Sequence, residues 1–383
     1  MKIEKVVVIM LLTLCGTALA DKITVIVSDG RVDTRDEFNM SAAARASYYA
    51  YGKNIASAAG NRNNGDIVLG FVDGTAAVAK YYALDTIITS GTVGDGSSLL
   101  GSTIRPNGEL YFGSMSGWVY ARDNTNVTAA PPGYALPADR QFATGANTYM
   151  YPTSSPLLSD EIIITQNDTG KIFLRQGNNM AEAPAGYLND GIEFGTTIFS
   201  QLGLSQGYIM FATNDGRVFI RYNNDLSIVP AGIVGDNTVI GGTGSPIKAL
   251  ARTAKDVLLI GNNAGELFLR NLKDLTEEPF PGKSYATFPG AIYSLTLTSN
   301  YNVVIGLDTG MVYVRSLTNG IAGTDITAPV NFGSPIVKLV AMPDPLTAAM
   351  TCDDETCYVD FEDFAQLALN WLKCNDPENT NCQ

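Results

Sequence analysis

A short phrase occurs seven times in this chain of 383 residues. In each copy an apolar run leads into a turn that ends in glycine, and a second apolar run follows. The spacing of the turn glycines, 43 to 53 residues, is about the length of a four-stranded sheet with its loops, and self-similarity at this period is typical of a β-propeller. The sequence therefore predicts an all-β fold, a seven-bladed β-propeller. The turn glycines are Gly30, Gly74, Gly117, Gly170, Gly216, Gly265 and Gly310.

A second recurring element begins with Ile or Leu about 18 residues before most turn glycines. We expect it to be the innermost strand of each blade. The hairpin at Gly30 has no such element before it, and the element at Ile336 has no hairpin after it. We therefore expect the Ile336 strand to pair with residues 23–27 and close the ring, whereas a linear stack of hairpins would leave both halves unpaired. The predicted inner strands begin at Ile55, Leu99, Leu157, Ile198, Ile247, Ile292 and Ile336.

Arginine follows the turn glycine by five residues in six of the seven copies. One interpretation is a cationic ring that binds an anionic polymer. The other is packing, in which each guanidinium stacks on the aromatic residue two positions earlier and bonds to neighbouring carbonyls. Packing rules repeat whereas binding sites break symmetry, so the repetition favours packing. The six residues are Arg35, Arg122, Arg175, Arg221, Arg270 and Arg315.

The first 20 residues have the pattern of a secretory signal peptide. Lys2 and Lys5 precede an apolar core, and the segment ends in Ala-Leu-Ala, which predicts cleavage before Asp21. Cys15 raises the alternative of a lipoprotein. The apolar core is too short to span a membrane, so we expect a protein that is secreted and extracellular, or associated with the cell surface. The net charge of −13 disfavours nucleic acid as a partner.

The chain contains no histidine. Histidine is the usual general base near neutral pH and the commonest metal ligand. Its absence excludes Ser-His-Asp and Cys-His catalysis, and it excludes metal sites that depend on imidazole ligands. Paired carboxylates remain as a route to catalysis.

Composition divides the chain into a signal peptide (1–20), the propeller (21–342), a linker (343–351) and a tail (352–383). The linker reads PDPLTAAMT, and the tail has apolar residues at helical spacing. All cysteines beyond the signal peptide lie in the tail, which predicts two disulfides in a small helical module. Three pairings are open. The four residues are Cys352, Cys357, Cys374 and Cys382.

The tail stretch CYVDFEDFAQLALNWLKC resembles the dockerin-like modules at the carboxyl end of secreted bacterial proteins. Those modules dock onto partner proteins, and their loops often hold calcium. The resemblance implies calcium ligands at Asp354, Thr356, Asp360 and Asp363, which is the only cofactor expected. One loop–helix unit is present where a full dockerin has two, so the module is truncated.

The blade phrase, as in ELYFGSMSGWVYARD, resembles the repeats of quinoprotein-like, PQQ-type propellers. Enzymes of that family place a tryptophan in each repeat and seat the quinone on a tryptophan. This chain has two tryptophans, Trp118 and Trp371. The resemblance therefore implies the fold without the cofactor, and it is closer to the non-enzymatic scaffold branch.

Short polar residues lead into several predicted inner strands, where loops of different blades meet near the axis. Ser97, Thr196, Ser245 and Ser334 are the candidate ligand-binding residues. We predict a non-catalytic scaffold or recognition module at the cell surface that binds an extracellular protein or polysaccharide, with self-association also expected. The alternatives are a polysaccharide-active enzyme that uses carboxylates and a structural subunit of a surface layer or filament.

Overall fold

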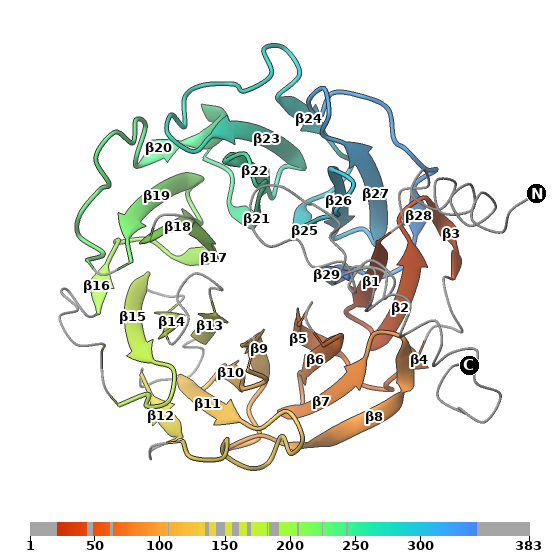
Figure 1. Cartoon of the computed structure of the whole chain (residues 1–383), viewed down its shortest axis with the longest axis vertical. Helices are drawn as coiled ribbons and strands as arrows, with labels where there is room; N and C mark the ends of the chain where they lie inside the picture. Colours follow the sequence, from red (N-terminus) through yellow and green to blue (C-terminus); the bar gives the residue numbers. More distant parts are fainter. Residues whose placement is uncertain are drawn as a thin grey trace, which may run out of the picture.

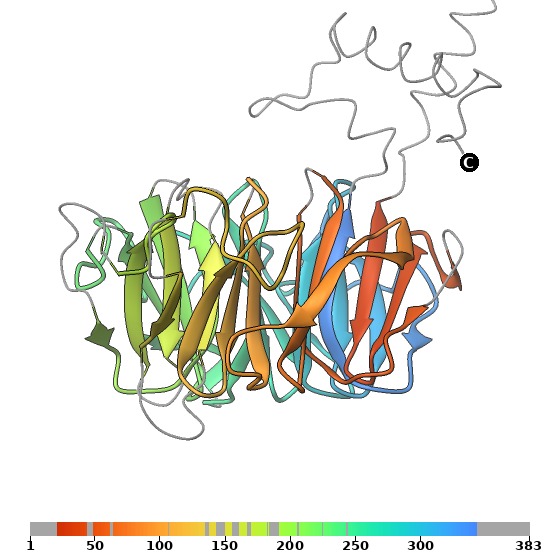
Figure 2. The same cartoon turned by 90° about the horizontal axis from the view of Figure 1, so that it is seen from below.

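The described part of the chain is a closed ring of antiparallel β-sheets. The computed structural model describes residues 21–342, apart from 44–48, 62–63, 106, 135–137, 143–149, 155–160, 167–169, 182, 184–190, 205–206, 224 and 243. The sheets stand around a common axis (Figure 1), and their strands run across the thickness of a flat disc (Figure 2). Helical structure in this part is limited to short 3-10 turns such as Ile240–Gly242. The all-β prediction is confirmed.

Each sheet runs from an inner strand near the axis to an outer strand at the rim. The inner strands are β5 (Ile55–Gly60), β9 (Leu99–Ile104), β13 (Met150–Ser154), β17 (Ile198–Leu204), β21 (Ile247–Arg252), β25 (Ile292–Leu297) and β29 (Ile336–Met342). The second strands are β1 (Lys22–Val27), β6 (Asp66–Phe71), β10 (Leu110–Ser114), β14 (Glu161–Gln166), β18 (Tyr208–Thr213), β22 (Val257–Asn262) and β26 (Asn302–Leu307).

The third and outer strands complete the sheets. The third strands are β2 (Arg31–Asp36), β7 (Thr75–Lys80), β11 (Trp118–Arg122), β15 (Lys171–Gln176), β19 (Arg217–Tyr222), β23 (Glu266–Asn271) and β27 (Met311–Ser316). The outer strands are β3 (Asn39–Ala43), β4 (Tyr49–Ala50), β8 (Ala83–Thr92), β12 (Asp139–Gln141), β16 (Ile192–Glu193), β20 (Thr238–Val239), β24 (Tyr285–Thr287) and β28 (Val330–Asn331).

Six of the sheets have the regular four-stranded form that the repeat predicts. The remaining sheet departs from this form. It has five strands and is built from both ends of the described chain, in the order β29-β1-β2-β3, with β4 also paired to β2. In place of one outer strand it therefore has two short ones, which pair with opposite ends of β2.

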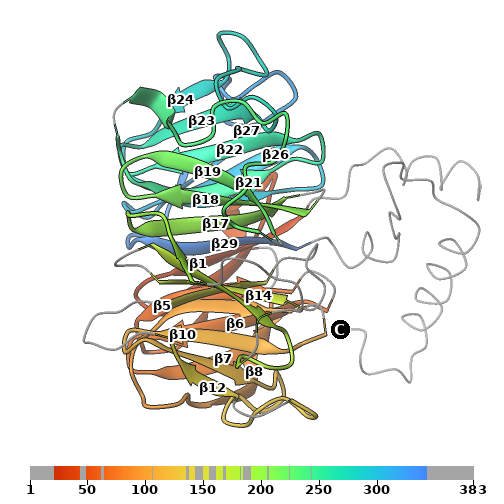
Figure 3. The ribbon, with the colours of Figure 1, turned by 90° about the vertical axis from the view of Figure 1, so that its left-hand side faces the viewer.

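The closure of the ring follows the prediction. Strand β29 pairs antiparallel with β1, from Lys22 opposite Met342 to Val27 opposite Ile336. The two strands lie side by side although they come from opposite ends of the sequence (Figure 3). β29 also contacts the neighbouring inner strands β25 and β5. The predicted pairing of the Ile336 strand with residues 23–27 is therefore confirmed.

The hydrophobic core is divided among the interfaces between neighbouring sheets. On the five-stranded sheet, Ile23 and Val25 pack with residues of β26 and β27, while Ile26 and Val32 pack with residues of β5, β6 and β7. Both faces of this sheet are thus covered by neighbours. This is why the strands carry bulky apolar residues on both faces, where a sheet with one wet face would alternate apolar with polar.

One inner strand differs from the prediction. Leu157 was expected to begin it, but the inner strand of that sheet is Met150–Ser154, and Leu157 lies outside the described residues. Leu157 is 13 residues before Gly170, whereas Ile198 is 18 residues before Gly216. A strand at the regular distance falls on Met150-Tyr-Pro-Thr-Ser, where a proline and two hydroxyl residues interrupt the apolar pattern. The other six inner strands begin at the predicted residue.

The turn glycines have a packing role besides their turn geometry. Gly74, Gly170 and Gly265 all have positive φ. A Cβ on any of them would lie within 2.4 Å of a backbone atom in the loop that leads into the next inner strand, such as Thr196 O at 1.9 Å from Gly170. The hairpin turns and the lead-in loops therefore touch each other at one end of the disc, called the hairpin face below.

Candidate functional site

The repeated arginines pack against aromatic rings, as the second interpretation predicts. Arg175 lies 5.3 Å from the Phe173 ring centroid, and Arg221 lies 5.3 Å from that of Phe219. The guanidinium of Arg221 also donates to the carbonyl of Ile220 at 2.8 Å, and the same bond to the preceding residue recurs in Arg122, Arg175 and Arg270. These contacts account for the repetition, so the arginines do not form a free cationic ring.

A β-bulge at the second residue of six inner strands is the feature most suggestive of a site. In each case the pairing register with the second strand shifts by one residue at that position. Bulges re-aim a side chain out of the regular pleat, and they are frequent next to binding and active sites. The bulged residues are Ala56, Leu100, Phe199, Lys248, Tyr293 and Val337.

The four candidate hydroxyl residues lie directly before these bulges, each three residues ahead of a bulged residue. All four are partly buried. The Ser97 backbone N–H donates to Asp95 at 3.0 Å, and backbone atoms of Ser245 and Ser334 face the turn glycines Gly216 and Gly310. The hairpin face thus brings the four loops to the same end of the ring, where part of their polarity serves turn packing.

The residues at or next to the bulges are not the same in every blade, and four successive inner strands carry large or charged ones there. Strands β17, β21 and β25 supply Phe199, Lys248 and Tyr293, and β29 supplies Lys338 one residue after its bulge. Lys248 Nζ lies 3.2 Å from the centroid of the Phe199 ring. Tyr293 exposes 41% of its surface, and Lys338 is exposed. We call these four residues the axial patch, because an exposed side chain on an innermost strand reaches solvent along the axis or at its mouth.

The electrostatics of the axial patch are opposite to those of the protein as a whole. None of the seven inner strands contains Asp or Glu, and in the described part of the chain neither Lys248 nor Lys338 forms an ion pair. Burial lowers the pKa of Lys248, whose side chain is partly covered by the neighbouring strands. Lys248 is therefore partly buried and Lys338 exposed, and neither positive charge is compensated by an ion pair among the described residues, on a chain of net charge −13. The patch was not predicted from the sequence. The one sequence feature that points to it is a lysine near the start of two predicted inner strands that otherwise begin with uncharged residues.

A cavity of about 410 Å³ lies at the opposite end of the disc, between the β21–β24 and β25–β28 sheets. Its walls are largely apolar, with Lys255 Nζ at 5.7 Å from the ring centroid of Tyr301 at one side. Tyr301 has a positive φ of 56°. No carboxylate lines the cavity, so it offers no acid–base pair. Its lining residues are Thr253, Lys255, Val257, Leu269, Phe280, Asn300, Tyr301, Leu317 and Thr318.

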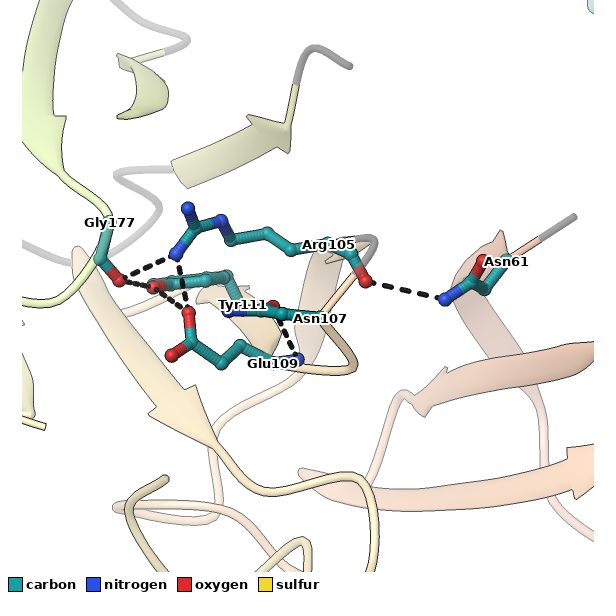
Figure 4. A network of polar contacts seen from close by, with 6 residues as sticks. All are labelled: Asn61, Arg105, Asn107, Glu109, Tyr111 and Gly177. Carbon is teal, nitrogen blue, oxygen red and sulfur yellow. Dashed lines mark hydrogen bonds and ion pairs between the residues drawn. The ribbon is translucent and has the colours of Figure 1, made fainter. Parts of the chain in front are cut away.

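A buried polar network joins three neighbouring sheets (Figure 4). Arg105 donates to Glu109 at 2.5 Å and to the carbonyl of Gly177 at 3.1 Å, and the Tyr111 hydroxyl donates to the same carbonyl. Asn61 of the adjacent sheet donates to the Arg105 carbonyl at 3.3 Å. Burial raises the pKa of Tyr111, so it remains a donor. Arg105 and Tyr111 are 4% and 0% exposed, so the network holds sheets together and is closed to a ligand.

Several sequence predictions fall outside the described residues. These are the signal peptide, the linker, the four tail cysteines and the calcium ligands Asp354, Thr356, Asp360 and Asp363. Within the described part, no group of three Asp, Glu, His or Cys residues is arranged to hold a metal ion. In that part too, no helix has the length and hydropathy that a membrane crossing requires.

Comparison with known proteins supports the fold and goes no further. No family model matches the chain, and no curated protein matches it. Among solved structures it is similar to the WD40 β-propeller domain of Doa1, with 13% identity over 77% of this chain and 88% of the other and a TM-score of 0.54. It is also similar to Raptor of Chaetomium thermophilum, with 12% identity, a TM-score of 0.57 and coverage of 83% and 26%. The computationally designed protein Ika8 matches with 13% identity, a TM-score of 0.55 and coverage of 85% and 94%.

Proposed function

We propose that this protein is a secreted, non-catalytic recognition module whose ring acts as a scaffold at the cell surface. The axial patch is the observation that carries the proposal. Phe199, Lys248, Tyr293 and Lys338 come from four successive inner strands and break a pattern that elsewhere repeats for packing. Packing between the regular blades does not explain why these four residues differ from those at the same position in the other blades, so the difference favours a ligand-binding role.

The chemistry of the patch favours an acidic polysaccharide as that ligand. The exposed Tyr293 ring offers a flat apolar surface on which a sugar ring can lie, and Lys248, held on the face of Phe199, attracts carboxylates together with Lys338. The four hydroxyl residues Ser97, Thr196, Ser245 and Ser334 lie on the same face and add hydrogen-bonding groups. No described carboxylate stands on an inner strand to cleave the sugar, which is why we favour binding over hydrolysis.

The proposal includes the parts of the chain that extend the described ring. The five-stranded sheet would act as the seventh blade, with closure by β29 in place of a covalent link. The signal peptide would direct secretion, and the tail would be a disulfide-pinned docking module with calcium in its acidic loop. The ring would then present a ligand site on its hairpin face while the tail attaches the protein elsewhere.

Binding to polygalacturonate, an acidic polysaccharide, tests the proposal. The wild-type protein should bind it and should not bind neutral dextran. Lys248→Gln should weaken binding about tenfold or more, since hydrogen bonds to charged groups contribute about 1.5–3 kcal/mol. Tyr293→Ser should also weaken binding, because the exposed ring on which a sugar would lie is lost. Lys273→Gln is the matched control, because Lys273 is an exposed lysine in the loop after β23 at the other end of the disc.

Three results would contradict the proposal. Equal binding of dextran would remove the role of charge. An equal loss in Lys273→Gln would show that binding depends on net charge and is independent of the patch. Release of reducing sugar from either polymer would support the alternative of a polysaccharide-active enzyme.

A further inference from the structure

Two buried carboxyl groups meet at the edge of the five-stranded sheet. Asp21 precedes β1, and Glu37 follows β2. The Glu37 N–H donates to the Asp21 carbonyl at 3.1 Å, which extends the β1–β2 ladder by one pair beyond Lys22 and Asp36. Both Asp21 and Glu37 are 0% exposed. This backbone pairing places Asp21 directly opposite Glu37 at the corner of the ring.

The same corner is fastened to the neighbouring sheet. The Asp21 carboxylate accepts hydrogen bonds from Ser299 N at 2.8 Å and from Ser299 Oγ at 2.7 Å. Glu37 Oε1 accepts one from Asn300 Nδ2. Ser299 and Asn300 form the turn between β25 and β26. These contacts join the five-stranded sheet, which contains both ends of the described chain, to the last four-stranded sheet.

The buried Glu37 carboxyl group has no positively charged partner among the described residues. Its Oε2 is buried without a hydrogen-bond partner, and in the described part of the chain Glu37 has no ion pair. Burial raises the pKa of Glu37, and the nearby Asp21 carboxylate acts in the same direction against hydrogen bonds from Thr298, Asn300 and the Asp21 backbone N–H. A buried carboxylate without a cation is costly, so the site calls for a positive charge close to Oε2.

We propose that cleavage before Asp21 supplies this charge, so that the new α-ammonium of Asp21 forms an ion pair with the Glu37 carboxylate. This inference rests on the proposed secretion. Water adds to the Ala20 carbonyl under a signal peptidase, the C–N bond to Asp21 breaks, Ala20 leaves as a carboxylate and the Asp21 nitrogen becomes an ammonium. The Asp21 backbone lies close enough to the Glu37 carboxyl to act on its pKa, against the effect of burial. The ammonium has three donors and a full charge at the same place, which suits the unpaired Oε2.

The consequence is a ring that becomes more stable when the leader is removed. The uncleaved precursor carries an uncharged amide at the site and leaves Glu37 uncompensated. The mature protein gains an ion pair at the corner where the closing sheet meets its neighbour. Removal of the leader would thus stabilise the closed ring only after export.

The test compares two proteins that differ by one native residue. Residues 21–383 and residues 20–383 are each produced behind a fusion partner whose protease leaves the first native residue free. In the second protein the ammonium sits on Ala20, one residue away from Glu37. Urea unfolding at pH 7 should show a folding equilibrium constant about tenfold or more larger for the protein that begins at Asp21. Glu37→Gln, made in both proteins, should abolish this difference.

Each outcome bears on the proposal. Equal stability of the two wild-type proteins would overturn it, and so would a difference that survives Glu37→Gln. Should Glu37→Gln fail to fold, N-acetylation of the Asp21 protein replaces it, since the acetyl group removes the charge while Glu37 stays in place. The fusion protease defines the first residue, so the stability comparison does not depend on where the natural cleavage occurs. Sequencing of exported protein tests the secretion proposal separately, and a different first residue would contradict the predicted cleavage before Asp21.

Discussion

Replacing the turn glycine Gly265 by alanine should destabilise the ring far more than the same replacement at Gly282. Both glycines have positive φ, 78° at Gly265 and 70° at Gly282. They differ in what a Cβ would meet. At Gly265 it would lie 2.4 Å from the carbonyl oxygen of Phe288 and 2.6 Å from that of Gly290, whereas at Gly282 nothing lies within 4 Å.

The two substitutions therefore separate two contributions to the loss of folding free energy, namely the left-handed backbone conformation and the steric overlap with the neighbouring loop. Gly282→Ala has only the left-handed backbone conformation to overcome, which costs about 1–2 kcal/mol for a residue with a Cβ. Gly265→Ala has the same cost and must in addition move backbone atoms of the loop that leads into β25. Overpacking of this kind costs about 1–3 kcal/mol. We expect a loss of about 1 kcal/mol at Gly282 and about 3 kcal/mol at Gly265.

Urea unfolding followed by far-UV circular dichroism measures both losses. Equal slopes for wild type and variants would show that the same transition is being compared. A Gly265→Ala loss within about 0.5 kcal/mol of the Gly282→Ala loss, a margin typical of additivity errors, would refute the reasoning. It would mean that the hairpin turns and the lead-in loops do not press on each other, and that turn geometry alone explains the repeated glycine.

Two further predictions concern single side chains. The pKa of Asp95 lies below its usual value, because hydrogen bonds such as that from the Tyr120 hydroxyl at 2.9 Å outweigh burial, which alone would raise it. Its contribution should be complete above the unfolded pKa near 3.9 and lost as the pH falls through the lower folded pKa. In thermal melts Asp95→Asn should therefore unfold more easily than wild type at pH 7, and the gap should shrink as the pH falls below about 3.9; a gap that stays constant across the acid range would contradict this. Arg221→Lys should cost about 1 kcal/mol in urea melts through lost stacking on Phe219, and a loss as large in a Phe219→Leu background, where that ring is absent, would contradict the explanation.

The elements that sequence predicts well are those set by the period of the repeat. Six inner strands begin at the predicted residue, and the closing pair of β29 with β1 follows from counting half-blades at the two ends. The stacking of the arginines was also accessible, because residues two apart on a strand share a face. These features depend on spacing alone, which a sequence records directly.

Other features depend on contacts between blades, which spacing does not record. Strand β13 was missed because Pro152 interrupts its apolar pattern. The bulges were missed because a single unpaired residue leaves the pattern of the strand intact. Gly261 and Gly306 in the second strands make room for Ile292 and Ile336 of the next inner strand, where a Cβ would lie 2.6 Å and 2.7 Å from a side-chain methyl. Such fits emerge only once neighbouring sheets are placed side by side.

The pairing of β29 with β1 also determines how the ring responds to tension. Met342 is opposite Lys22 at one end of this ladder, and Ile336 is opposite Val27 at the other, near the hairpin face. Forces that pull residues 22 and 342 apart would unzip the ladder one pair at a time. A ligand held at the hairpin face and an anchor attached beyond Met342 would instead pull along the length of β29 and load its pairs together in shear. Shear geometry resists force better than unzipping, so a ring held in this way would be strongest along the line from the ligand to the anchor.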